Sequence, residues 1–480
     1  MANEAIQTKE KNPLGYKPIG SLLVSFSVPA IISCLINSIY NIVDQIFIGQ
    51  GVGYLGNAAT TVAFPVMTII LAFGTLIGSG SSAYAAIRLG EKREEEAERT
   101  LSNAFLFTII TGLLLMAVGL IFLKPILSVF GATEKIMPYA VDYTSIILIG
   151  TPFNLIGIVL SNLARTDGHP RLSMYGMMIG AVLNTILDPV YIFVFHWGVK
   201  GAAIATITSQ IISAVVLTAY FVMKVKKPIH MRLHRNYMKL KRKRITSFLA
   251  LGVSSGITQS VACIMQVVMN NSLVYYGDQT QIGGDVALSA MGIVMKIAMI
   301  MGAFGVGVGI GAQPILGYNR GAGQYERIKK TYKIAVSFAT LLIFVCWIFC
   351  QTMPETIIGI FGNENADFTD FAVKCLRIYL FSIFCAGFQI VSTNYFQATG
   401  QPLKASILSM LRQLLLLIPL ILILPLFMGL NGILYSAPIA DVASAVIVAF
   451  FIVPEMKKLN QHIRQEPELK EEGEQAGVSL

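Results

Sequence analysis

Two carboxylates inside long apolar runs are the residues of this sequence most suited to ion chemistry. Asp44 lies in the run from Ser21 to Gly49, and Asp188 lies in AVLNTILDPV. A carboxylate at the centre of a membrane helix costs roughly 2.5–3.5 kcal/mol, so such residues are functional candidates. If the two helices met, repulsion between like charges would favour uptake of a proton. With an amide and a hydroxyl nearby, the same oxygens could ligate Na⁺, since hard cations prefer oxygen ligands.

Polar residues accompany Asp44 at helical spacing. Asn37, Tyr40, Asn41 and Asp44 are spaced i, i+3, i+4 and i+7, which places them on one helix face. A polar face on a membrane helix should point at other protein or at water. Pro29, in the same run, removes one helical hydrogen bond and favours a kink. The functional interpretation is an ion or proton site coupled to helix bending, and the alternative is polar packing around a tolerated proline.

Asp188 has a similar setting. Asn184 and Asp188 share a helix face at i, i+4, and Pro189 follows at once and weakens the helix there. The next run offers Thr206 in GAAIATITSQ. Sequence alone does not bring these helices to Asp44, so two separate carboxylates, each capped by hydroxyls and amides, stay the alternative.

The second half of the chain carries different charges. Its first apolar run has Gln and Asn at 259, 266, 270 and 271 but no carboxylate. Lys296, Arg412 and Asp441 lie in later runs. The two cations could repel cationic ligands, pair with Asp441, or bind an anionic group.

Composition indicates a polytopic membrane protein. Of the 480 residues, 55% are hydrophobic and only 13% are charged, against about one quarter in soluble domains. The net charge of +10 resides in short loops, so it indicates membrane topology rather than nucleic-acid binding. The six cysteines and five histidines show no spacing for a disulfide framework or a zinc site. The apolar runs hold no histidine and no nucleophile–base motif, so we expect no enzyme activity and no cofactor other than a coupling ion.

The apolar runs predict an all-α protein with twelve membrane-spanning helices. The expected spans are 20–48, 57–87, 101–123, 137–164, 172–195, 200–223, 245–276, 285–317, 331–351, 372–396, 404–427 and 432–453.

Loop charges predict the orientation. The loop between the sixth and seventh spans has ten Lys or Arg and no acidic residue. The N-terminus, every second loop and the C-terminal tail are also basic, whereas the intervening loops carry few cations. The positive-inside rule therefore places both termini on the cytoplasmic side of the cell membrane. The basic loop could contact anionic lipid or act only as a linker.

The chain repeats itself. GTLIGSGSSAYAAIRLG from Gly74 aligns with GVGVGIGAQPILGYNRG from Gly305, 231 residues later, and SNLARTDGHP from Ser161 aligns with TNYFQATGQP from Thr393. Two six-helix halves of equal orientation follow, as in transporters built from parallel repeats. The expected domains are a tail at 1–19, an N-lobe at 20–223, a linker at 224–244, a C-lobe at 245–453 and a tail at 454–480.

Several motifs together resemble a known family. They are PAIISCLINSIYNIVDQIFIGQG from Pro29, the glycine-rich second run followed by RLGEKREEEA, and RTDGHPRLSMYGMMIGAVLNTILDP from Arg165. The second half contains the corresponding sequences GYNRGAGQYER and QATGQP. The chain thus resembles the multidrug and toxic compound extrusion (MATE) transporters, most closely their bacterial MepA-like branch, from about Ile19 to Pro454.

The resemblance implies a MATE/MOP-type fold of two six-helix bundles around a central cavity. It also implies that Asp44, Asn184, Asp188 and Thr206 form the coupling-ion site, with Tyr143 joining them and Pro29 as the bend of the first helix. Some relatives use acidic residues on the seventh and tenth helices instead. This sequence lacks them, which argues against an ion site in the C-lobe.

We therefore expect a secondary antiporter, acting as a monomer, that exports amphipathic organic cations in exchange for H⁺ or Na⁺. The alternative within transport is a flippase for lipid or lipid-linked sugar, in which Lys296 and Arg412 would hold a phosphate. A passive channel and a membrane-embedded enzyme are alternatives of other classes. No ATP-binding motif is present, which argues against a primary pump.

Overall fold

The computed structural model describes residues 12–223, 230–359 and 366–475. The side chains of Asn41, Tyr54, Asp285, Ala366 and Asp367, and those beyond 465, lie outside this description. The described part is helical throughout, without strands. The helices are α1 (Ile19–Val52), α2 (Tyr54–Gly90), α3 (Glu94–Ile121), α4 (Leu123–Val129), α5 (Met137–Thr166), α6 (Pro170–Pro189), α7 (Gly198–Val222), α8 (Arg242–Gly277), α9 (Gly284–Gly321), α10 (Tyr325–Thr352), α11 (Pro354–Gly359), α12 (Ala366–Tyr379), α13 (Cys385–Ala398), α14 (Pro402–Met410), α15 (Ile418–Ile423), α16 (Pro425–Met428) and α17 (Leu430–Gln475), with short turns of other helix types at η1 (Pro13–Gly15), η2 (Val190–Val194), η3 (Arg235–Tyr237) and η4 (Leu411–Leu417).

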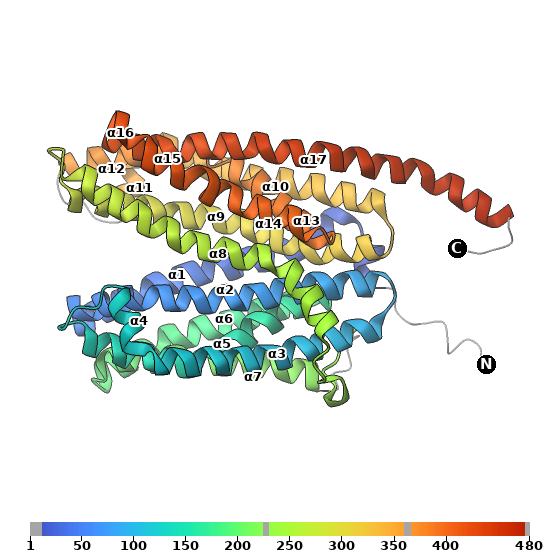
Figure 1. Ribbon diagram of the computed structural model, residues 1–480, viewed down its shortest axis with the longest axis horizontal. Helices are drawn as coiled ribbons and strands as arrows, with labels where there is room; N and C mark the ends of the chain where they lie inside the picture. Colours follow the sequence, from blue (N-terminus) through green and yellow to red (C-terminus); the bar gives the residue numbers. More distant parts are fainter. Residues whose placement is uncertain (1–11, 224–229, 360–365, 476–480) are drawn as a thin grey trace.

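The helices form two bundles that lie side by side, α1–α7 in one and α8–α17 in the other (Figure 1). We call them the N-lobe and the C-lobe. Within the described residues, eleven helical stretches are long and apolar enough to cross a membrane. The predicted all-α, two-bundle membrane fold is confirmed.

The tenth predicted span, 372–396, is present but interrupted. It consists of α12 and α13, joined by a turn at 380–384. There the backbone changes to i→i+3 hydrogen bonds, from Phe381 to Ile378 and from Ile383 to Leu380. This tighter winding breaks the α-helix without a proline or glycine, so the sequence pattern did not reveal it.

Two other spans contain wider, π-helical turns. Pro189 ends α6 because it has no N–H to donate, and the chain continues as the π-helical turn η2. The corresponding C-lobe span contains the π-helical turn η4, which includes Arg412. In each lobe a charged residue within the membrane helix thus stands at or beside a π-helical turn, a feature frequent at functional sites.

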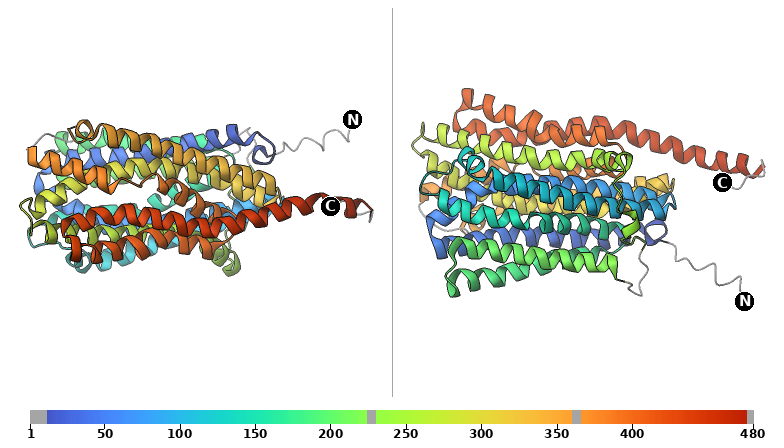
Figure 2. Two further views of the ribbon diagram at one scale, coloured as in Figure 1. Left: turned by 90° about the horizontal axis from the view of Figure 1, so that it is seen from above. Right: turned by 60° about the horizontal axis from the view of Figure 1, so that its bottom comes forward.

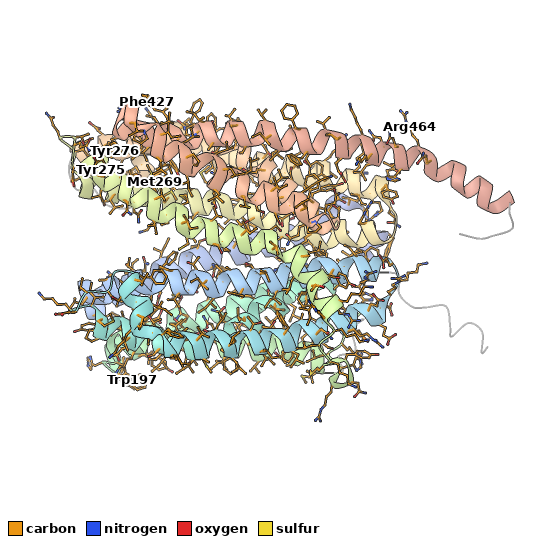
Figure 3. The ribbon with its side chains drawn as sticks, viewed as in Figure 1. Trp197, Met269, Tyr275, Tyr276, Phe427 and Arg464 are labelled. Atoms are coloured by element: carbon orange, nitrogen blue, oxygen red, sulfur yellow. The ribbon has the colours of Figure 1, made fainter. Side chains whose placement is uncertain are left out.

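The start of α1 and the end of α17 lie at one end of the molecule, and the lobes meet at that end and diverge toward the other (Figure 1, Figure 2). Figure 3 marks the diverging end by Trp197, Tyr275 and Tyr276, with Arg464 near the opposite end. We call these the open end and the closed end. The closed end is the end that the loop charges predict to be cytoplasmic, although its sidedness stays a prediction.

Glycines bring the backbones of the two lobes together near the closed end. A Cβ added to Gly252 of α8 would overlap the carbonyl oxygen of Leu76 in α2. Cβ atoms added to Gly307 and Gly311 of α9 would lie 2.6 Å and 2.7 Å from the Cα atoms of Ile31 and Ser27 in α1. Only residues without a side chain permit such close helix contacts.

A hydrogen-bond cluster lies within the same interface. The Gln397 amide donates to Ser79 Oγ (2.9 Å), Leu251 O (2.9 Å) and Ser255 Oγ (3.1 Å). Ser79 belongs to α2 of the N-lobe, whereas the other three residues belong to the C-lobe. The hydrogen bonds of this buried amide favour one alignment of the two lobes, in addition to the close packing at the glycines.

The lobes exchange the first turns of their first helices. Leu22, Leu23 and Phe26 of α1 are buried in an apolar cluster whose other members, Leu14 and Ile31 apart, come from α9, α10, α13, α14, η4 and α17. Phe248 of α8 is buried in an apolar cluster of α2, α3, α5 and α7, to which the linker adds Met231. The predicted lobe limits at 20 and 245 thus lie within segments that pack on the opposite bundle.

The segments before these helices are fastened in the same crossed manner. Arg327 of α10 donates to the carbonyl oxygens of Leu14 (3.1 Å) and Lys17 (2.9 Å). The linker, whose residues 224–229 lie outside the described part, is held by Asp167 at the end of α5. The backbone N–H groups of His230 and Met231 donate to Asp167 Oδ1 at 2.9 and 2.8 Å.

We predict that Gly252→Ala forces the lobes apart at the closed end, because the new methyl group has to displace the helix by on the order of 1 Å or more. Spin labels on Arg93→Cys and Lys457→Cys, in a chain whose native cysteines are replaced by alanine, should report longer distances. Gly292→Ala is the matched control, since no atom lies within 4 Å of a Cβ there. Equal distance distributions in the two variants would contradict the tight-contact interpretation.

We predict that Asp167→Ala releases the linker. Loss of a buried acceptor of two backbone N–H groups should lower the local opening free energy by roughly 1–3 kcal/mol. Hydrogen–deuterium exchange at His230 and Met231 should then become roughly 10–100-fold faster. Asp142→Ala, which removes a carboxylate paired with Lys200 at the surface, should leave this exchange unchanged.

Candidate functional site

A buried amide joins the polar residues of α6 and α7. Asn184 Nδ2 donates to Asp188 Oδ1 at 3.1 Å and to Thr206 Oγ1 at 3.2 Å. Asn184, Asp188 and Thr206 are 2%, 0% and 5% exposed. Asn184 lies one helical turn before Asp188 on the same face of α6. The packing of α7 on α6 brings Thr206 next to Asn184.

Asp44 and Tyr143 complete this cluster from two further helices. The Asp44 carboxyl, on α1, lies close enough to the Asp188 carboxyl for the two to interact directly. The Tyr143 phenol, on α5, is 2% exposed and lies within electrostatic range of both carboxyls and of Tyr40. The five residues that the resemblance assigned to an ion site are therefore brought together from α1, α5, α6 and α7. Whether they couple an ion stays a prediction.

Several oxygens of the cluster lack a donor among the described residues. They are Asp44 Oδ1, Asp188 Oδ2 and Asn184 Oδ1, all buried at the atomic level. A buried polar atom without a partner costs about 1–3 kcal/mol, so such atoms are rare in native proteins and each needs a physical explanation. Three converging acceptors suit a shared proton or a hard cation such as Na⁺.

The other residues predicted on the polar face of α1 lie nearby. Asn37 is exposed and Tyr40 is half-buried, and both side chains have interaction partners. The prediction for the Asn41 side chain lies outside the described residues. Pro29 is buried, and it lies between Ser27 and Ile31, the two residues of α1 that contact the glycines of α9.

The C-lobe charges separate into a pair and a single cation. Arg412 Nε donates to Asp441 Oδ1 at 2.5 Å, and the Asp441 side chain is 2% exposed. Lys296 is exposed on α9 and forms no ion pair with a described residue. Of the alternatives left open by the sequence, pairing thus holds for Arg412 with Asp441 and not for Lys296.

The sequence did not identify a second buried polar group, near the closed end of the N-lobe. Arg165, counted among the loop charges, is 6% exposed and donates to Ser173 Oγ (2.5 Å) and Asn162 Oδ1 (2.8 Å). Tyr220 donates to Asp167 Oδ2 at 2.6 Å. The D-G pair in RTDGHP correctly signals a turn, but no sequence signal indicates that its charges are buried.

Comparison with known proteins agrees with this architecture. The MatE family model matches residues 29–190 and 260–423, more than half of the chain. The chain belongs to the MatE family. The two matched segments begin 231 residues apart, the same offset as the internal repeat.

The MatE relatives include multidrug export proteins. MepA of Staphylococcus aureus (strain MSSA476) is 27% identical over 453 residues, covering 94% of this chain and 96% of its own. MepA of Staphylococcus haemolyticus (strain JCSC1435) is 26% identical over 434 residues, covering 90% and 92%.

Solved structures share the fold. An outward-facing multidrug resistance MATE transporter of the MOP superfamily has a TM-score of 0.88 at 21% identity, covering 95% of this chain and all of its own. A MOP superfamily transporter from Pyrococcus furiosus has a TM-score of 0.87 at 21% identity, covering 95% and 99%. This MatE protein is therefore a multi-pass membrane protein with the two-lobe fold of MATE transporters.

For this MatE protein we predict that Arg412→Met is strongly destabilising, by about 3–5 kcal/mol, because it leaves the Asp441 carboxylate buried without its partner. The double variant Arg412→Met, Asp441→Leu should regain most of that loss. Melting in detergent, followed by tryptophan fluorescence, measures both. Lys200→Met breaks an exposed pair with Asp142 and should change stability by less than about 1 kcal/mol. A double variant no more stable than Arg412→Met would show that the pair is not the cause.

Proposed function

We propose that this protein is a secondary active exporter that moves amphipathic organic cations outward in exchange for inward movement of H⁺ or Na⁺. The observation that carries the proposal is the buried cluster of Asp44, Asp188 and Asn184, with three acceptor oxygens that lack a donor among the described residues. Membership of the MatE family and the multidrug export function of MepA relatives support it.

The proposed orientation places both termini in the cytoplasm. The basic loops that motivate it include the linker after α7, which docks at the closed end through Asp167. With this orientation the closed end faces the cytoplasm and the open end faces outward. The conformation described above then corresponds to the outward-facing stage of the cycle.

The coupling route that we propose runs along α1. Asp44 belongs to the ion cluster, and Ser27 and Ile31 of the same helix pack closely against Gly311 and Gly307 of α9 in the C-lobe. Pro29 lies between these two contacts and lacks the N–H that would stiffen the helix. Ion binding draws Asp44 toward Asp188, bends α1 at Pro29, and changes the α1–α9 contact.

Substrate and ion thus act on one conformational equilibrium rather than on one binding surface. Each shifts the equilibrium only by its differential affinity for the two forms. In this scheme the ion stabilises the bent α1, and the bend lowers affinity for the substrate, which leaves outward. The ion then dissociates into the cytoplasm after the lobes rock.

We predict that proteoliposomes with this protein accumulate a fluorescent organic cation against its gradient when a pH gradient or a Na⁺ gradient is imposed. Asp188→Asn and Asp44→Asn should each abolish accumulation, because a neutral amide cannot release and rebind a proton and holds Na⁺ weakly. Asp142→Asn is the matched control, since its carboxylate is exposed in the same lobe.

The two gradients identify the ion, because only the coupled one drives accumulation. Movement only down the dye's own gradient, unaffected by Asp188→Asn, would contradict coupled export and favour a passive pathway.

A further inference from the structure

Lys296 lies on the side of α9 that faces the N-lobe, nearer the open end than the glycine contacts. It precedes Gly307 by eleven residues, about three helical turns, so the two share one face of α9. Gly307 contacts Ile31 of the N-lobe, which fixes the direction of that face. Lys296 is exposed, and one turn further out a Cβ on Gly292 would meet no atom within 4 Å.

Helix α8 has amide side chains on its own N-lobe-facing side. Gln259, Gln266 and Asn270 follow Gly252 by seven, fourteen and eighteen residues, about two, four and five turns, so they share its N-lobe-facing side. Gln266 Nε2 donates to Asn270 Oδ1 at 2.9 Å.

Carboxylates are scarce on this side of the C-lobe. Helix α8 contains no Asp or Glu at all. The only one in α9, Asp285, stands in its first turn, eleven residues before Lys296, and its side chain lies outside the described part. Asp441, in α17, is paired with Arg412. The lysine therefore has no described counter-ion.

The part of the N-lobe that α2 presents to this side is apolar. Ile69 and Phe73 of α2 precede Leu76, which contacts Gly252 and Gly256 of α8, by seven and three residues and so share its direction. They are 46% and 39% exposed. A ligand between the diverging lobes thus meets apolar side chains of α2 on the N-lobe side and an ammonium with amides on the C-lobe side.

We propose that Lys296 binds an anionic group of the substrate, so that the preferred substrates are amphipathic zwitterions that carry a carboxylate besides their cationic group. An ammonium without a counter-ion attracts a carboxylate and repels a simple cation. Neighbouring amides donate further hydrogen bonds to the same group. This inference deepens the proposed export function by defining its substrate class, and it rests on that function for its physiological meaning.

The test uses a matched pair of dyes, a rhodamine carboxylic acid and its methyl ester, which differ only in the anionic group. Fluorescence anisotropy measures their affinities for the purified full-length protein in detergent. Wild type should prefer the acid, and Lys296→Met should reduce the acid-to-ester affinity ratio on the order of ten-fold. Lys296→Arg should keep the preference, and Lys124→Met, which removes an exposed cation of α4, should not change it.

The binding assay tests the Lys296 inference, and the transport assay tests the export function, so the two proposals can fail independently. No preference for the acid in wild type, or an unchanged ratio in Lys296→Met, overturns the inference whatever the protein transports. Acid-selective, Lys296-dependent binding without gradient-driven accumulation of either dye supports the Lys296 site and contradicts the export function. Selective binding together with accumulation of the acid supports both.

Discussion

The structure depends on backbone contact between the lobes at one end only. At Gly252, Gly307 and Gly311 the helices of opposite lobes approach so closely that no side chain fits. Dispersion and hydrogen bonding are favourable there, and the Gln397 amide adds a polar anchor to Ser79. Because this contact is confined to the closed end, the remainder of each lobe diverges from its partner. The exposed side chains between the lobes follow from it.

The two halves repeat one plan but differ at the residues that matter chemically. With the offset of 231 residues, Pro29 corresponds to Ser260 and Asp44 corresponds to Tyr275. Helix α8 contains no proline, whereas α1 has Pro29 between its two contacts with α9. The N-lobe keeps two interacting carboxylates, and the C-lobe keeps a neutralised Arg412–Asp441 pair. The repeat therefore provides the symmetric frame, and of the two corresponding helices α1 and α8 only α1 combines an internal proline with a carboxylate.

Much of this could be predicted from the sequence because membrane helices are read from long apolar runs. The helices, their repeat and the residues Asp44, Asn184, Asp188, Thr206 and Tyr143 follow from apolar length, helical spacing and resemblance. The break between α12 and α13 could not be predicted, since a change to i→i+3 hydrogen bonds needs no special residue. Burial of Arg165 and Asp167 was also missed. Their partners, Ser173, Tyr220 and the linker backbone, come from other segments and leave no local signal.

The crossed packing of the first helices has a consequence for biosynthesis. Leu22, Leu23 and Phe26 leave the ribosome early, but their neighbours in α9, α10 and α13 are made only after most of the chain. Until then the first helix has an apolar stripe without its final partners, held by lipid or by the insertion machinery. The N-lobe consequently cannot reach its native packing as an independent unit, although domains of many proteins complete folding in order of synthesis. In the last assembly step of this membrane protein, each half therefore supplies buried side chains that complete the apolar core of the other half.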